Sequence, residues 1–167
     1  VLAGYKLRKP IGAGPTGTVY SAIKPTTGER FAVKVVHPYL TEGAGSAEQL
    51  LKQGRRLVAL RHPGIVSVLH AGQLDGGAVY LVAEFIQGQP LTDVLDRQGP
   101  LTFAQAAPLV EALAATLHVA HRQDVVHGNL TPANIWLCPR EDGAWPPRVK
   151  VMDFGLSALH QAEPGAD

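Results

Sequence analysis

Alternation of apolar and polar positions, with runs of β-branched residues, dominates the first half of the chain. This pattern predicts five strands, at residues 5–9, 18–23, 30–36, 65–71 and 78–85. One stretch, 47–60, instead repeats its apolar residues at helical spacing, although Gly54 weakens a helix there. Residues 41–46 are rich in Gly and Ser and are predicted to form a loop.

The second half of the chain changes to helical periodicity after the boundary signal Gly88-Gln89-Pro90. A short helix is predicted at 91–98 and a long one at 102–123, which Thr102 caps in a capping-box pattern with Gln105. Short buried strands are predicted at 125–126, 135–137 and 149–151. A mostly antiparallel sheet with one helix, followed by a helical layer, predicts the α+β fold class.

Composition indicates a folded domain of ordinary charge. The chain has 167 residues, of which 46% are hydrophobic and 17% charged, so it is expected to bury a core as one domain. A net charge of +1 without a long charge run argues against nucleic acid as a partner. The single cysteine, Cys138, excludes an internal disulfide framework and suits a reducing compartment. Beside Pro139 on a predicted loop, it is more often an incidental residue than a nucleophile.

The chain is expected to have no membrane segment. No apolar run approaches the roughly 20 residues of a membrane span, and no signal peptide is recognisable. Because the sequence starts at Val1 without Met, we interpret it as a piece of a longer protein, which leaves open a membrane anchor outside the piece. The expected location is cytoplasmic.

A glycine motif, G-x-G-x-x-G-x-V at 12–19, lies between the first two predicted strands. Glycines allow backbone N–H groups to approach phosphate oxygens closely, although the same pattern alone also describes a plain hairpin turn. The motif does not open a helix, which counts against a dinucleotide-binding Rossmann fold. Pro15 has no N–H group, so a phosphate cradle here is expected to lose one contact.

Two further motifs identify a family. Residues 127–134 read His-Gly-Asn-Leu-Thr-Pro-Ala-Asn, and Asp153-Phe154-Gly155 follows them. With the glycine motif and Ala32-Val33-Lys34, they resemble the Ser/Thr protein-kinase family, whose patterns include H-R-D-x-x-x-x-N and D-F-G. The style of the sequence is similar to bacterial members.

The resemblance covers residues 5–158, about the first three-fifths of a kinase domain. It implies that 1–167 is one kinase-like domain of bilobal fold. Residues 1–87 would form the N-terminal lobe, an antiparallel sheet with one helix. Residues 88–167 would form a partial helical C-terminal lobe whose remainder is absent from the chain.

The resemblance also implies an ATP and Mg²⁺ site. Glu84 to Ile86 match the hinge that binds adenine, Ala83 matches the gatekeeper, and Trp136 matches the residue beneath adenine, where an indole either stacks on the base or fills its place. Asn134 and Asp153 match the magnesium ligands, and their oxygens suit this ion. The implied nucleotide-binding positions are Gly12, Gly14, Gly17, Val19, Ala32, Lys34, Glu84, Ile86 and Trp136. Taken alone, Lys34 is also compatible with a solvent-facing strand residue, Asn134 with a loop cap and Asp153 with a turn residue.

The catalytic loop departs from the family pattern. Asn129 stands at the position of the catalytic Asp, and its neutral amide can orient a hydroxyl but cannot accept its proton. Loss of a general base costs on the order of 10²–10⁴ in rate. Thr131 removes a cation near the γ-phosphate, and Gly128 replaces the Arg that reads activation-loop phosphorylation. Asn129 is equally suited to capping the loop and keeping its geometry.

The clamp on Lys34 also departs from the pattern. Counting back from His62-Pro63-Gly64-Ile65-Val66 places Gln53 where the family has a Glu that pairs with this lysine. Gln53 can donate or accept a hydrogen bond but cannot pair the charge. Glu48 lies five positions earlier, about 140° away around the helix, and cannot substitute for it.

Three functions stay open at this stage. The first is an ATP-binding pseudokinase with a regulatory or scaffolding role, which the changes at Gln53, Asn129 and Thr131 favour. The second is an active Ser/Thr protein kinase, which the retained Lys34 and Asp153 favour. The third is a protein-interaction module without nucleotide, which Pro15, Gln53 and Trp136 favour. Protein substrates or partners are not identified by the sequence.

Overall fold

The computed structural model describes residues 2–41 and 46–154. They fall into two compact units, which are described separately. Of these residues, 2–41, 46–59 and 67–85 form the first unit, and 60–66 and 86–154 form the second. The lobes expected at 1–87 and 88–167 differ from this division at 60–66 and at 86–87. Gly155, the rest of the C-terminal stretch and most of the loop expected at 41–46 lie outside the described residues.

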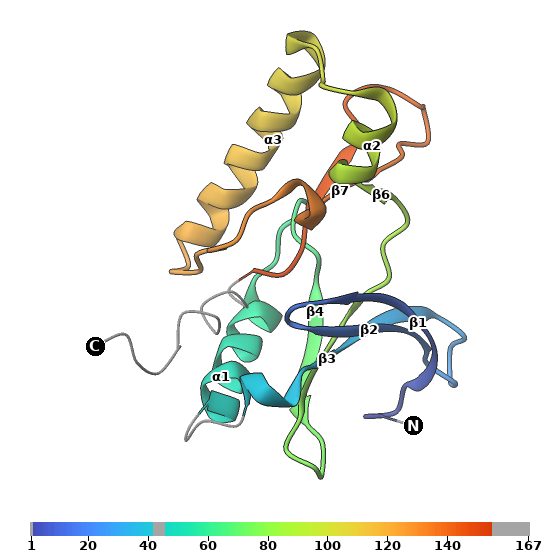
Figure 1. Ribbon diagram of the computed structural model, residues 1–167, viewed down its shortest axis with the longest axis vertical. Coiled ribbons are helices and arrows are strands. Elements are labelled where there is room, and N and C mark those ends of the chain that lie inside the picture. The colour runs from blue at the N-terminus through green and yellow to red at the C-terminus, as the bar shows by residue number, and fades with distance from the viewer. Residues whose placement is uncertain (1, 42–45, 155–167) are drawn as a thin grey trace. The chain divides into compact units, whose positions relative to one another are not determined.

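The first unit is built on a five-stranded antiparallel sheet (Figure 1). The order of its strands is β1–β2–β3–β5–β4, with bounds β1 Lys6–Gly14, β2 Gly17–Ile23, β3 Arg30–Val36, β4 Val68–Gln73 and β5 Val79–Glu84. β3 has the predicted bounds, while β1 runs on to Gly14 and so includes half of the glycine motif. This sheet confirms the predicted antiparallel layer.

One predicted strand start is wrong. β4 begins at Val68, whereas Ile65 forms an isolated parallel bridge with Val151 in the second unit. The N–H of Val66 donates to the Val151 carbonyl at 2.9 Å, and the N–H of Val151 donates to the Gly64 carbonyl at 2.8 Å. The apolar run at 65–71 therefore contributes residues to two different sheets. Hydrophobic periodicity alone cannot show where the chain passes from one sheet to the other.

Helix α1, Ser46–Ala59, packs on β4 and β5. Its Leu50 joins Val36, Val79 and Leu81 in one core cluster on that side of the sheet. A second cluster contains Leu2, Ala22, Val33, Tyr80 and Val82. Gly54 faces the sheet so closely that an added Cβ would lie 2.7 Å from the Ala71 Cβ, which explains a glycine inside this helix.

The second unit combines two helices with a small antiparallel sheet. Its helices are α2 Leu91–Gln98, as predicted, and α3 Phe103–His121. Its strands, in the order β6–β7–β8, are Gln89–Pro90, Ile135–Cys138 and Arg148–Val151. The strand predicted at 125–126 is wrong, because the Val125 N–H donates to the Ala120 carbonyl at the end of α3 and only Val125 of the two valines is buried.

Helix α3 has the predicted capping box, since the Gln105 N–H donates to the Thr102 hydroxyl and the Gln105 side chain accepts from the Thr102 N–H. The helix is apolar around most of its circumference, and Phe103 is 88% exposed and Val110 61% exposed. An 18-residue window of α3 has mean hydropathy 1.3 with 17% of it buried. By length and composition α3 is one candidate for a membrane span, but a single helix of this kind is weak evidence, because core helices of soluble proteins pass the same test.

Candidate functional site

The glycine motif forms the hairpin between β1 and β2. Gly14 pairs with Gly17, and Pro15 and Thr16 make the turn. A Cβ on Gly17 would lie 2.3 Å from the Val35 carbonyl oxygen, so this position requires glycine on steric grounds. Nothing lies within 4 Å of a Cβ built on Gly12 or Gly14. The open space beside Gly12 and Gly14 would allow a ligand to approach the backbone closely.

Lys34 lies in the middle of β3, between Val19 on β2 and Leu81 on β5. Because directly paired residues and residues two apart share a face of a sheet, Val19, Ala32 and Lys34 lie on one face. Lys34 is 8% exposed, which rules out a solvent-facing strand lysine. Ala83, the expected gatekeeper, pairs with Ala32 and thus lies on the same face.

Helix α1 covers the face of the sheet that carries Lys34, since Leu50 packs against Val36 and Leu81 there. Gln53 on α1 is half-buried, whereas Glu48 in the first turn is exposed. This difference agrees with the expectation that the two residues point to different sides of the helix. The half-buried position thus carries an uncharged side chain.

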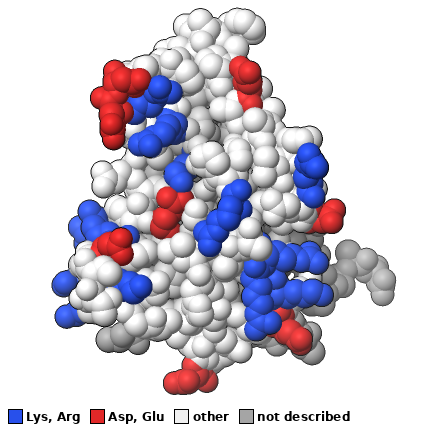
Figure 2. Space-filling view, turned by 180° about the vertical axis from the view of Figure 1, so that it is seen from behind, with Lys and Arg blue, Asp and Glu red and all other residues white. Residues whose placement is uncertain are grey.

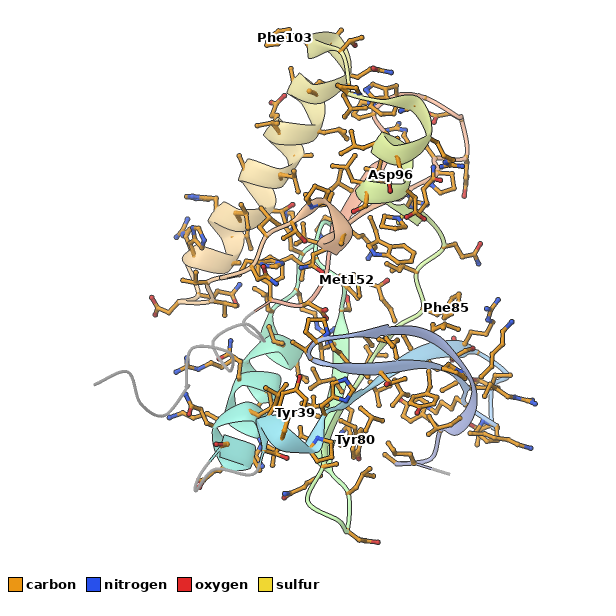
Figure 3. All side chains as sticks on the ribbon, viewed as in Figure 1. Tyr39, Tyr80, Phe85, Asp96, Phe103 and Met152 are labelled. Atoms are coloured by element: carbon orange, nitrogen blue, oxygen red, sulfur yellow. The ribbon has the colours of Figure 1, made fainter. Side chains whose placement is uncertain are left out.

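Glu84, at the end of β5, makes two hydrogen bonds to Ser67 that the sequence did not indicate. Its carboxylate accepts the Ser67 N–H at 2.8 Å, and its own N–H donates to the Ser67 carbonyl at 3.0 Å. The guanidinium of Arg30 lies 4.0 Å from the ring centre of the next residue, Phe85 (Figure 3). Glu84 and Phe85 thus fix the end of β5, while Ile86 belongs to the second unit.

The loop at 127–134, in the second unit, is held by hydrogen bonds between its own side chains and its backbone. The Asn129 N–H donates to Nδ1 of His127 at 3.3 Å, and the Asn129 carbonyl accepts from Nδ2 of Asn134 at 2.9 Å. A short 3-10 turn, Pro132–Asn134, places Asn134 directly before β7. Gly128 has φ +76°, a conformation that glycine adopts without cost, and the side chain of Asn129 is exposed.

The same loop is bonded to the segment that carries Asp153. Nε2 of His127 donates to the Met152 carbonyl at 2.8 Å, and the Met152 N–H donates to the Asn134 carbonyl at 3.0 Å. The ring of His127 packs on Phe154 with 4.7 Å between ring centres. The structure therefore joins the loop that carries Asn129 and Asn134 to Met152 and Phe154, the two neighbours of Asp153 in the chain. Asp153 has φ +62°, which is uncommon for a residue other than glycine.

Histidine 127 is the member of this assembly that sequence reasoning missed. It is 3% exposed, and burial lowers the pKa of its imidazole, although the Met152 carbonyl and Asp153 act in the opposite direction. A ring that donates from Nε2 and accepts at Nδ1 is the neutral tautomer. Its position at the start of a kinase-like loop was visible in the sequence, but its burial was not.

The donor set suits a magnesium ion. The side-chain amide nitrogen of Asn134 donates to the Asn129 carbonyl, so the side-chain oxygen of Asn134 is the atom that could coordinate a metal. Asp153 adds a carboxylate. Hard oxygen donors of this kind are what Mg²⁺ prefers. Within residues 2–41 and 46–154, no group of three or more His, Cys, Asp and Glu side chains could hold a metal. Trp136 is half-buried on β7, where it pairs with Pro90 and Lys150.

On the face seen in Figure 2, basic side chains form one contiguous group at the lower right, and elsewhere acidic and basic residues are interspersed. In the loop between β7 and β8, an ion pair joins Arg140 to Asp142 at 3.0 Å. It lowers the pKa of Asp142 to about 2. Both residues are exposed and serve the conformation of the loop between β7 and β8.

Residues 5–166 match the protein kinase domain family, and the chain belongs to that family. It is 33% identical over 162 residues to the serine/threonine-protein kinase pkn2 of Myxococcus xanthus, and the match covers 97% of this chain and 19% of that protein. It is also 33% identical over 164 residues to the serine/threonine-protein kinase PknA of Mycobacterium tuberculosis, covering 96% of this chain and 37% of that protein. The family expected from the motifs is thus confirmed.

Solved structures show the same fold. The kinase domain of Mycobacterium tuberculosis PknI matches with a TM-score of 0.77 at 23% identity, covering 93% of this chain and 61% of that one. Rad53 1–466 in complex with AMP-PNP matches with a TM-score of 0.76 at 28% identity, covering 92% and 38%. The kinase fold predicted for the chain is confirmed. The chain spans 19% and 37% of the length of the two curated relatives named above.

Proposed function

We propose that the chain is an ATP- and Mg²⁺-binding kinase domain whose phosphotransfer is strongly impaired, and that it acts on protein partners by regulation or scaffolding. Asn129 is the observation that carries this proposal. Its backbone is bonded to His127 and Asn134, so the loop keeps its conformation, while its side chain is a neutral amide. The structure of the loop is kept and the general base is lost.

The remaining groups support binding of the nucleotide. Lys34 would neutralise the α- and β-phosphates, and the open backbone of Gly12 and Gly14 would approach the phosphates. Asn134 and Asp153 would hold Mg²⁺, which supplies charge stabilisation for phosphoryl transfer when it is bound. Asn129 would orient a substrate hydroxyl through its amide oxygen without removing the proton.

An active kinase is the second candidate, because Lys34, Asn134 and Asp153 are all retained and the relatives are named serine/threonine-protein kinases. This alternative requires that orientation by Asn129 is sufficient for transfer. It also requires a surface for protein substrates.

Calorimetry of the purified full-length protein with ATP, with and without Mg²⁺, tests the binding part of the proposal. We expect magnesium-dependent binding that Lys34→Ala abolishes and that Lys24→Ala, an exposed lysine of the same unit, leaves intact. No binding at millimolar ATP would contradict the proposal. It would favour an interaction module in which Trp136 fills the place of adenine.

Replacement of Asn129 then distinguishes the proposal of an impaired kinase from the proposal of an active kinase. Asn129→Asp restores a carboxylate and is expected to raise the phosphotransfer rate by on the order of 10²–10⁴ from a level near zero. Asn129→Ser is the control, since a hydroxyl restores no base at neutral pH. A high rate in the original protein, changed little by Asn129→Asp and abolished by Asp153→Ala, would establish the active kinase instead.

A further inference from the structure

The tip of the glycine hairpin is tied to the segment between β3 and α1. Three successive carbonyl groups of the tip accept hydrogen bonds from that segment. The Gly14 carbonyl accepts from Nε2 of His37 at 3.0 Å, and the Thr16 carbonyl accepts from the His37 N–H at 3.3 Å. The Pro15 carbonyl accepts from the hydroxyl of Tyr39.

The two donating residues also support each other. Their rings are stacked with 5.5 Å between centres and 18° between planes. Tyr39 lies in the 3-10 turn Pro38–Leu40, which the His37 carbonyl begins by accepting the Leu40 N–H at 3.1 Å (Figure 3). His37 and Tyr39 thus form one stacked and hydrogen-bonded pair, which we call the tip clamp.

The hairpin needs such support because its turn is not of a favoured kind. Two-residue hairpins prefer turns in which one or both central residues have positive φ. Neither Pro15 nor Thr16 has a positive φ, and proline cannot adopt one. An external bond to each carbonyl of the turn compensates for geometry that the strands alone do not favour.

The tip clamp also fixes the direction of a donor. The Pro15 carbonyl and the Thr16 N–H belong to one planar trans peptide, in which the two groups point in opposite directions. While Tyr39 holds the carbonyl, the Thr16 N–H points away from Tyr39. Because the preceding peptide, at Pro15, has no N–H, Thr16 supplies the first backbone donor of the turn.

We propose that His37 and Tyr39 are positioning residues that hold the tip of the glycine hairpin in one conformation and thereby present the Thr16 N–H to the phosphates of a bound nucleoside triphosphate. This inference rests on the proposed function, since it needs a nucleotide in the site. It explains how a glycine motif with a proline at its tip keeps a useful geometry. The gain comes from preorganisation, because the donor does not have to be ordered when the ligand binds.

Tyr39→Phe tests this role, since it removes the hydroxyl and keeps the ring that stacks on His37. In calorimetry on the full-length protein, we expect the Kd of ATP with Mg²⁺ to rise about two- to ten-fold, the value of one hydrogen bond, and the Kd of adenosine to stay unchanged. Adenosine has no phosphates, so its Kd is not expected to depend on a hydrogen bond from the Thr16 N–H to a phosphate. Equal losses for both ligands, or no loss for ATP, would overturn the proposal.

Tyr80→Phe is the matched control. Tyr80 lies on β5 in the same unit, and its hydroxyl bonds to Nε2 of His70 at 3.2 Å, away from the hairpin. The change is chemically identical, and we expect neither affinity to move. A rise in the Kd of ATP as large as that of Tyr39→Phe would show a general effect on the sheet and would overturn the role of Tyr39.

Amide hydrogen exchange at residues 14–17 separates failure of this inference from failure of the proposed function. Without any ligand, Tyr39→Phe should make the Thr16 and Gly17 amides exchange faster than in the original protein, and unchanged exchange would show that Tyr39 does not hold the tip. If the original protein binds neither ATP nor adenosine, the proposed function fails and the phosphate role fails with it, whatever the exchange shows. If it binds both and only the variant's exchange and ATP affinity change, both proposals stand.

Discussion

At the scale of single residues, His127 joins three parts of the second unit through one ring. It contacts the Met152 carbonyl, the Asn129 N–H and the Phe154 ring. A proton added at Nδ1 would replace the acceptor for Asn129 by a second donor, so the assembly requires the neutral form. The lowered pKa of the buried imidazole agrees with this requirement.

This arrangement predicts a loss of stability in mild acid. The folded-state pKa of His127 lies below its ordinary value of 6.5, so the unfolded chain takes up the proton first as the pH falls. The contribution of His127 is complete above pH 6.5 and is lost as the pH falls toward the folded-state pKa. His127→Gln, which does not titrate, should flatten the difference in unfolding free energy between pH 7.5 and pH 5, measured by chemical denaturation. An unchanged pH dependence would contradict this assignment.

The glycines of the nucleotide motif are predicted to have different roles. Gly17→Ala would force a Cβ against the Val35 carbonyl and should cost about 1–3 kcal/mol of unfolding free energy. Gly12→Ala and Gly14→Ala meet open space and should leave thermal unfolding almost unchanged. Thermal unfolding followed by circular dichroism measures all three. Equal midpoints for Gly17→Ala and Gly12→Ala would refute the distinction.

At the scale of elements, the hydrophobic pattern predicted most helices and strands because their apolar positions follow the period of the element they form. It failed where one run contacts two partners, as at 65–71, where Ile65 and Val68 join different sheets. It also failed at Val125, whose burial comes from the end of α3 and not from a strand. For the site, motif spacing predicted Asn129, Asn134 and Asp153, whose roles stay predictions. It could not reveal the bonds of Glu84, His127 and Tyr39, because these depend on which backbone groups meet in space.

Helix α1 gives a prediction in which helix propensity and packing oppose each other. Alanine favours a helix over glycine by about 0.8–1.0 kcal/mol. At Gly54, however, the added methyl would lie 2.7 Å from Ala71 and 3.0 Å from Leu81, so we expect Gly54→Ala to lower the unfolding free energy by about 1–3 kcal/mol. Gln49→Ala, at an exposed position of α1, is the control and should have little effect. Stabilisation by Gly54→Ala would show that α1 can move off the sheet.

At the scale of the whole molecule, helix α3 carries an exposed apolar surface. Phe103 and Val110 are 88% and 61% exposed. Isolated apolar groups on a surface are normal, but a helix that is apolar around most of its circumference is usually covered. The solved PknI kinase domain is longer, since the chain covers 61% of it.

Residues 1–167 made alone should therefore self-associate and bind a hydrophobic dye. Phe103→Ser combined with Val110→Lys removes the two largest exposed apolar side chains of α3 and should lower both signals in light scattering and dye fluorescence. His118→Ser, a polar change at an exposed position of the same helix, should change neither. A monomer without dye binding before any substitution would contradict the expectation.

The route of the chain through its two units has a consequence for splitting or recombining such a gene. Because 60–66 belongs to the second unit while 67–85 returns to the first, no single cut separates the two units. A fragment ending at residue 85 carries Gly64 and Val66 away from Val151, their hydrogen-bond partner. The fragment beginning at residue 86 would lack that edge beside β8. A single crossover between homologous genes at 59/60 or at 85/86 divides one unit between the two parents, whereas a crossover between 60 and 85 divides both. Crossovers between 60 and 85 should therefore disrupt function more often than crossovers at 59/60 or 85/86.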